Sequence, residues 1–151
     1  MKIIYAPEKF DVSNKTVFLA GTIDEGNSVD WQQEVADSLN DLDVTLLNPR
    51  RKNWDNTWKQ SIGNEKFVEQ VEWELSSLES SDYILMYYAK SSKSPISLLE
   101  LGLYANSNKM IIICPDGFWR KGNVEIVANK YNIPLFNDLE SGIIFLKTKF
   151  L

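Results

Sequence analysis

Short apolar runs alternate along this chain with longer segments whose apolar residues recur every three or four positions. Runs of the first kind are typical of buried strands, and segments of the second kind are typical of helices. The expected strands are residues 17–20, 44–47, 83–88, 110–114 and 133–136. The expected helices are residues 28–42, 64–78, 94–106, 123–130 and 139–147. This alternation predicts an α/β fold: a doubly wound, mostly parallel five-stranded sheet with helices on both faces.

The chain has 151 residues, and neither a linker nor an internal repeat interrupts the pattern. We therefore expect one domain over residues 1–151. In a doubly wound sheet, ligands bind beyond the carboxyl ends of the strands, where the strand order reverses. The loops at that edge are expected after Ala20, Leu47, Tyr88 and Cys114.

Four aromatic residues fall in these loops: Trp54, Trp58, Phe118 and Trp119. Two interpretations are open. Their rings could stack on a nucleobase, or they could seal the loops and an oligomer interface.

The residues that are missing exclude several classes of enzyme. The chain has no histidine and a single cysteine, so Ser-His-Asp and Cys-His catalysis are excluded and a tight zinc site is not expected. It also lacks the GxGxxG and GxxxxGK[ST] phosphate loops. We expect neither a metal nor a cofactor, and any transfer or hydrolysis must depend on carboxylates, lysines or hydroxyls.

The charge and hydropathy of the chain bound its partners. A net charge of −5 without a basic face argues against binding to a nucleic-acid polymer, although Arg50 and Arg51 could meet one phosphate. No apolar run approaches the roughly 20 residues of a membrane helix, and the N-terminus lacks the apolar core of a signal peptide. We expect a cytoplasmic protein without a membrane partner. Cys114 follows three isoleucines, and we interpret it as a thiol of the core.

Glu100 is the leading candidate for chemistry. It lies in the second turn of a helix that Ser94 should cap and Pro95 should begin, and leucines flank it on both sides. If this stretch is buried, the acid must find a partner or a function, and the helix N-terminus would favour its ionised form. Such a carboxylate is a good nucleophile toward an anomeric carbon. The alternative is a surface glutamate of an amphipathic helix.

Two further features of the helices are open to a functional interpretation. Glycine at position 102 lowers helix stability by about 1 kcal/mol relative to alanine. Close packing or the approach of a ligand could explain its presence; the alternative is that the helix simply tolerates it. Glu72 and Glu74 flank Trp73, and only one of them can share the inward face. The helical wheel favours Glu74 as an acid for a leaving group, while a solvated helix face is the alternative.

Several short motifs, in this order, resemble the nucleoside 2-deoxyribosyltransferase family, in particular its small phage and bacterial branch. They are Phe18-Leu19-Ala20-Gly21-Thr22-Ile23-Asp24, Asp30-Trp31-Gln32, Asn48-Pro49-Arg50-Arg51, Gln70-Val71-Glu72-Trp73-Glu74-Leu75, Ser94-Pro95-Ile96-Ser97-Leu98-Leu99-Glu100-Leu101-Gly102 and Gly117-Phe118-Trp119-Arg120-Lys121-Gly122-Asn123-Val124. The resemblance covers most of the chain, and the Glu100 segment carries it most strongly.

The resemblance implies roles for individual residues. Glu100 matches the family's nucleophile, which attacks C1′, expels the base and holds a glycosyl ester. Glu74 matches an aspartate that contacts and protonates the base. Asn123 matches an asparagine that reaches the sugar in a neighbouring subunit, which implies a homo-oligomer with shared active sites. The stretch from Phe18 through Ala20 and Gly21 to Thr22 would lie under the sugar.

The chain also departs from the best-known branch of the family. Ser94 replaces a second aspartate that contacts the base, and branches with serine there cleave nucleoside 5′-monophosphates. Val17-Phe18 replaces a tyrosine near the first strand, and the chain ends Phe150-Leu151 where that branch has a sugar-binding tyrosine.

These observations leave three hypotheses. The first is transfer of deoxyribose from a 2′-deoxynucleoside to a second free nucleobase. The second is N-glycoside hydrolysis of a nucleoside or its 5′-monophosphate, in which water replaces the second base. The third is a non-catalytic nucleotide-binding module. The substrate-binding residues expected besides Glu100 and Glu74 are Phe18, Ala20, Gly21, Thr22, Asn48, Arg50, Arg51, Ser94, Gly102 and Asn123.

Overall fold

The computed structural model describes residues 1–23 and 29–151. Asp24 and Ser28, which figured in the expectations above, lie outside these residues. The strands are β1 (Lys2–Tyr5), β2 (Lys15–Gly21), β3 (Val44–Asn48), β4 (Tyr83–Tyr87), β5 (Met110–Ile113) and β6 (Leu135–Phe136). The helices are α1 (Trp31–Ser38), α2 (Glu65–Ser80), α3 (Pro95–Tyr104), α4 (Lys121–Tyr131) and α5 (Leu139–Lys147), with short 3-10 turns at Ala105–Ser107 and Thr148–Phe150.

The strands of the described residues form one sheet in the order β1-β3-β2-β4-β5-β6, and every pair is parallel. The doubly wound α/β fold is therefore confirmed. The prediction of five strands was wrong, because the sheet has a sixth strand, β1. This strand has four residues, of which Ile4 is buried and Ile3 packs partly against the core, so its apolar run is short. Its place at the sheet edge comes from pairing with β3, from Lys2 opposite Thr45 to Tyr5 opposite Asn48.

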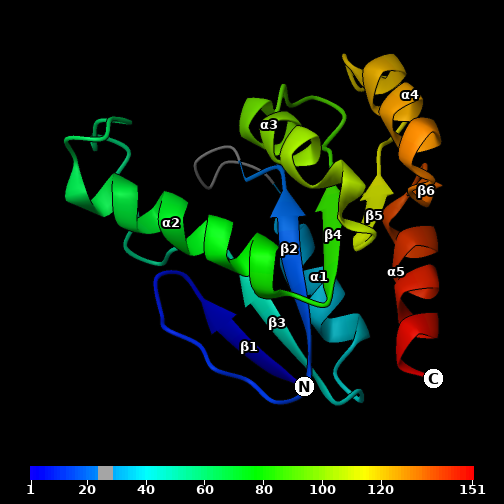
Figure 1. Cartoon of the computed structure of the whole chain (residues 1–151), viewed down its shortest axis with the longest axis horizontal. Coiled ribbons are helices and arrows are strands. Elements are labelled where there is room, and N and C mark those ends of the chain that lie inside the picture. The colour runs from blue at the N-terminus through cyan, green and yellow to red at the C-terminus, as the bar shows by residue number, and fades with distance from the viewer. Residues whose placement is uncertain (24–28) are drawn as a thin grey trace.

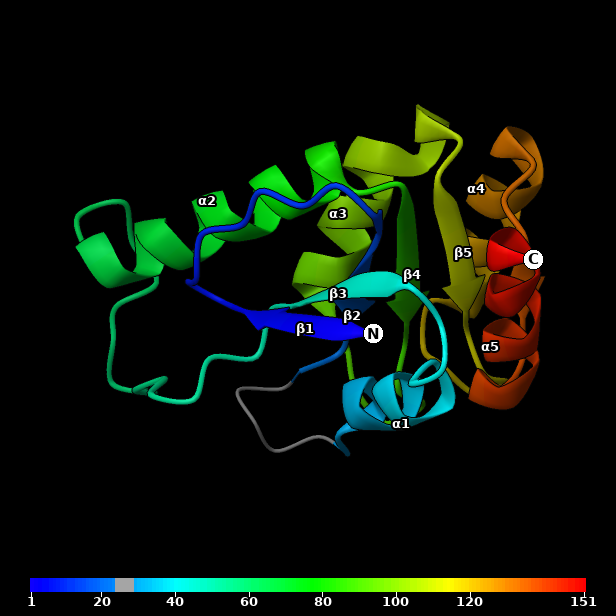
Figure 2. The ribbon, with the colours of Figure 1, turned by 90° about the horizontal axis from the view of Figure 1, so that it is seen from below.

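Helices cover both faces of the sheet (Figures 1 and 2), as predicted. The alternation of side chains along β2 shows how the two faces are filled. Phe18 and Ala20 point into the core beneath α2, α3 and α4, whereas Val17 and Leu19 point into the core beneath α1 and α5. Cys114 is fully buried in the first of these cores, so its interpretation as a core thiol is confirmed.

The strand order reverses between β2 and β4. The chain passes from β2 to β3 on one side and then crosses to β4 on the other, which makes this boundary the expected ligand site. Gly21 ends β2 here with φ +129°, and a Cβ at this position would lie 2.2 Å from the carbonyl oxygen of Tyr87. Only glycine allows the two strands to approach this closely as they leave the sheet.

The helix starts explain how the site is held. Asp30 caps α1 by accepting from the N–H of Gln33, and Asn64 caps α2 by accepting from Lys66 and Phe67. Pro95 begins α3 and Ser94 stands at its N-cap position, as predicted, but the Ser94 side chain makes no capping hydrogen bond. Ser94 has φ 46°, and its hydroxyl contacts Thr22 and Ser92 instead. Within the described residues, no helix is long and apolar enough to cross a bilayer.

Candidate active site

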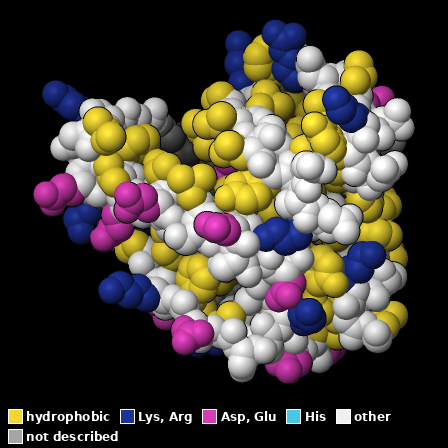
Figure 3. All heavy atoms as spheres, in the orientation of Figure 1, with side chains coloured by type: hydrophobic (Ala, Val, Ile, Leu, Met, Phe, Trp, Pro, Cys, Tyr) yellow, Lys and Arg dark blue, Asp and Glu magenta, His cyan; other side chains and the backbone are white. Residues whose placement is uncertain are grey.

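A cleft of about 1170 Å³ opens at the carboxyl edge of the sheet. Its walls come from residues that end or follow β1, β2, β3 and β4, and from the inward faces of α2 and α3. Figure 3 shows hydrophobic side chains on both sides of a notch between the first half of α2 and α3. The cleft therefore lies where the reversal of strand order predicts a ligand.

Glu100 projects from the second turn of α3 into this cleft, and only 8% of the residue is exposed. The alternative that it is a surface glutamate is thus wrong. Burial, and then the negative charge of Glu74, raise the pKa of Glu100 to about 8. The helix N-terminus was expected to favour its ionised form, but the raised pKa runs in the opposite direction. The helix dipole acts mainly within the first turn, and desolvation outweighs it here.

Glu74 lines the same cleft from α2, whereas Glu72 is exposed on the other side of that helix. Glu74, rather than Glu72, is therefore the candidate acid for a leaving group. Burial raises the pKa of Glu74 to about 7, although a hydrogen bond from Gln70 Nε2 to its Oε1, at 3.2 Å, acts in the opposite direction. Two carboxyl groups with raised pKa values thus share one cleft, as acid–base chemistry near neutral pH requires.

Hydroxyl groups connect the end of β2 to the start of α3. The Oγ of Ser94 lies 2.5 Å from Thr22 Oγ1 and 3.0 Å from Ser92 Oγ. Thr22 Oγ1 also accepts from the N–H of Ala89. Thr22 and Ser94 both line the cleft, as do Phe18, Ala20 and Gly21, so the structure brings these five predicted residues together beside Glu100.

The two arginines also line the cleft, and carboxylates already neutralise them. Arg50 contacts Asp30 at 3.3 Å and donates from Nε to Gln32 Oε1. Arg51 pairs with Glu69 at 2.7 Å, and its guanidinium lies over the ring of Trp58. The Nη1 atom of Arg51 is nevertheless buried without a hydrogen-bond partner.

Three predicted residues lie outside the cleft lining of the described chain. Asn48 is buried, and its Oδ1 accepts from the N–H of Arg50, so it shapes the turn after β3. Gly102 is exposed, with no atom within 4 Å of an added Cβ, which excludes close packing inside the chain. Asn123 is exposed on α4.

The aromatic residues of the loops differ in their positions, and only some of them could stack on a nucleobase. Trp54 lines the cleft and packs edge-to-face on Trp58, with ring centroids 5.0 Å apart. Phe118 instead packs on Tyr88 in the core. Trp119 lies on the surface beside Lys93 and Arg120.

Several polar residues of the cleft were not among the predicted site residues, and Tyr5 and Gln70 are two of them. Tyr5 ends the strand that was not predicted. Gln70 precedes Glu74 by four positions, so it lies one turn away on the same helix face, and that spacing was the available signal.

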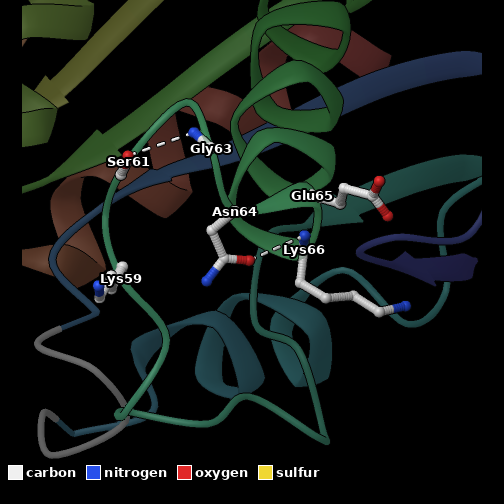
Figure 4. Close-up of a pocket in the computed structure, with 6 residues that line it drawn as sticks. All are labelled: Lys59, Ser61, Gly63, Asn64, Glu65 and Lys66. Carbon is white, nitrogen blue, oxygen red and sulfur yellow. Dashed lines mark hydrogen bonds between the residues drawn. The ribbon is translucent and has the colours of Figure 1, made fainter.

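A second hollow, of about 580 Å³, lies at the start of α2. Figure 4 shows that its Asn64 side chain turns toward the N–H of Lys66, which is the cap of the helix. Its lining residues are largely exposed, and Glu65 is its one carboxylate. In the described chain, no group of three or more His, Cys, Asp or Glu side chains could hold a metal ion. The larger cleft is therefore the candidate active site.

Comparison with known proteins agrees with this geometry. A search of curated proteins finds no match. A conserved protein from Enterococcus faecalis V583, known from its crystal structure, superposes with a TM-score of 0.62 over 91% of this chain and 99% of its own. Its sequence identity of 12% makes this a likeness of fold alone. The family described as nucleoside 2-deoxyribosyltransferase like matches residues 14–118, which include β2, β4, α2, α3 and both cleft carboxyls. This chain therefore belongs to the nucleoside 2-deoxyribosyltransferase-like family.

Proposed function

We propose that this protein is a nucleoside 2-deoxyribosyltransferase that moves deoxyribose from one nucleobase to another. The observation that carries the proposal is the pair of carboxyl groups, Glu74 and Glu100, in one cleft at the reversal of strand order. Membership of the family favours this reaction over other uses of a carboxyl pair.

The reaction follows a double displacement. The ionised Glu100 carboxylate attacks C1′ as the bond from C1′ to the base nitrogen breaks, and the Glu74 carboxyl gives its proton to the departing base. This leaves a glycosyl ester on Glu100 and an ionised Glu74. A second base then attacks C1′ while Glu74 takes its proton and Glu100 leaves. Two inversions return the original configuration at C1′.

The raised pKa values suit these two roles. Glu74, with a pKa of about 7, holds a proton that it can give near neutral pH. Glu100 must lose its proton to solvent before attack, and the positive charge that develops at C1′ then stabilises the carboxylate in the transition state. The carboxylate is thus stabilised most as the glycosidic bond breaks, which is the condition for catalysis.

Hydrolysis of a nucleoside 5′-monophosphate is the second candidate, and one observation favours it. Arg51 Nη1 is buried and unpartnered in the cleft wall, where it could donate to a phosphate oxygen. In that reaction water replaces the second base, and Glu100 keeps its role.

The test is to incubate the protein with 2′-deoxynucleosides or their 5′-monophosphates, with and without a second base, and to resolve the products by chromatography. A new nucleoside that forms only with added base supports transfer, and free sugar or sugar phosphate in both samples supports hydrolysis. Glu100→Ala should abolish either reaction, while Glu72→Ala should leave it unchanged. Thermal stabilisation by nucleosides with no product from any sample would instead support a binding module.

We also propose that the active site is shared within a homo-oligomer. Supporting observations are the exposed Asn123 and the exposed apolar residues on the cleft side of α3, which are Ile96, Leu99 and Leu103. Glu100→Ala and Asn123→Ala each remove one part of a shared site. If the sites are shared, mixing the two variants under conditions of subunit exchange restores part of the activity; if each chain works alone, mixing restores none.

A further inference from the structure

An unpaired acceptor lies in the wall of the cleft beside Glu74. Four buried side-chain atoms of the described residues have no hydrogen-bond partner, and two of them, Arg51 Nη1 and Gln70 Oε1, belong to residues that line the cleft. Gln70 is 6% exposed. A buried amide oxygen without a donor costs about 1–3 kcal/mol, so a ligand that supplies a donor gains at this point.

The orientation of the Gln70 amide is fixed by its neighbours. Its Nε2 donates to the backbone oxygen of Pro49 at 2.8 Å and to Glu74 Oε1 at 3.2 Å. Because both partners accept at these contacts, turning the amide over would place oxygen against oxygen. The atom without a partner is therefore an acceptor, held next to the Glu74 carboxyl, and a ligand reaches it by displacing the side chains that cover it.

We propose that Gln70 selects the base: its Oε1 accepts a hydrogen bond from an exocyclic amino group while Glu74 donates to the adjacent ring nitrogen. Adenine and cytosine carry this pair of groups. In hypoxanthine and uracil an oxygen replaces the amino group and would face Gln70 Oε1 without a proton between them. This inference rests on the proposed function only in taking a nucleobase as the occupant of the cleft.

The test measures binding of free bases, which needs no turnover. Dissociation constants for adenine, purine and hypoxanthine, and for cytosine and uracil, are measured by calorimetry on the unaltered protein. Adenine should bind about 10- to 100-fold more tightly than purine or hypoxanthine, and cytosine should exceed uracil by a similar factor. Gln70→Met should reduce each ratio to about one.

Gln32→Met is the matched control. Gln32 is a fully buried amide with its own unpartnered atom, Nε2, but it does not line the cleft. This variant should keep the preference for amino bases. If Gln70→Met does not fold, Gln70→Ala replaces it, since alanine adds no bulk and favours the helix.

The outcomes separate the two proposals. Equal affinity of the unaltered protein for adenine and purine overturns the role of Gln70, whatever the exchange assay gives. A preference that survives in Gln70→Met, or is lost equally in Gln32→Met, overturns it as well. A preference that depends on Gln70 in a protein that forms no product supports the inference and removes the transferase.

Discussion

Burial of Glu100 should make the stability of this protein fall as pH rises, and replacement by glutamine should remove the share of that fall that Glu100 contributes. Glu100→Gln keeps the shape of the side chain but cannot ionise. The pKa of Glu100 is raised from its ordinary value of 4.5 to about 8 by burial and by Glu74. The folded chain therefore holds this proton more tightly than the unfolded chain does.

The sign and size of the effect follow from linkage between proton binding and folding. Below about pH 4.5 both states are protonated, and the folded state bears no penalty at this group. As pH rises toward 8 the unfolded chain loses the proton while the folded chain keeps it, so stability falls; above about pH 8 the loss is complete. A rise in pKa from 4.5 to about 8 corresponds to about 5 kcal/mol, at about 1.4 kcal/mol for each pKa unit.

The assay is urea unfolding of the unaltered protein and of Glu100→Gln across pH 4 to 9. The difference in free energy of unfolding between the two isolates Glu100, because the other carboxyls largely cancel. We expect this difference to grow by about 3–5 kcal/mol in favour of Glu100→Gln, mostly between pH 5 and 8. Glu72→Gln, at an exposed position of α2, should show no such trend. Parallel curves for the unaltered protein and Glu100→Gln would refute a buried, destabilised carboxyl.

Three further outcomes follow from the structure. Gly21→Ala should lower the free energy of unfolding by more than about 3 kcal/mol, because the new Cβ meets the Tyr87 backbone at 2.2 Å; urea unfolding near the stability of the parent would contradict this. Gly102→Ala should raise it by up to about 1 kcal/mol, since the Cβ meets nothing within 4 Å; a loss in the same assay would show a contact that the chain alone does not make. Glu74→Ala should slow cleavage most for bases that leave poorly, and equal slowing across a series of bases would remove Glu74 as the acid.

The fold could be predicted because its signal is spread over many residues. Each central strand contains a mostly apolar run, and each helix repeats its apolar face, so no single residue decides the result. The strand β1 escaped prediction for the opposite reason: its four residues bury one side chain, and main-chain pairing with β3 holds it in place. The short run Ile3-Ile4-Tyr5 is a weaker signal than the longer apolar runs of the central strands.

The candidate site could be predicted only in part. The position of Glu100 follows from a helix that begins at the ligand edge, and the inward face of α2 distinguishes Glu74 from Glu72. The raised pKa of Glu100 could not be predicted from the sequence, because it depends on how completely α2 and the strand ends exclude water from the carboxyl. The turn at Ser94 was hidden too, since its left-handed conformation serves a hydroxyl contact with Thr22, which is 72 positions away.

The cleft carboxyls are costly to the protein that carries them. Both Arg50 and Arg51 line the same cleft, yet the ion pairs found for them in the described chain are with Asp30 and Glu69. Among the described residues, no ion pair joins a cation to Glu74 or Glu100, and burial, followed by the charge of Glu74, raises the pKa of Glu100. A carboxyl retained for stability would be paired or solvated. In the proposed reaction, an anomeric carbon that gains positive charge as its base departs would supply the missing partner, so the cost of burying these carboxyls would be recovered where the glycosidic bond breaks.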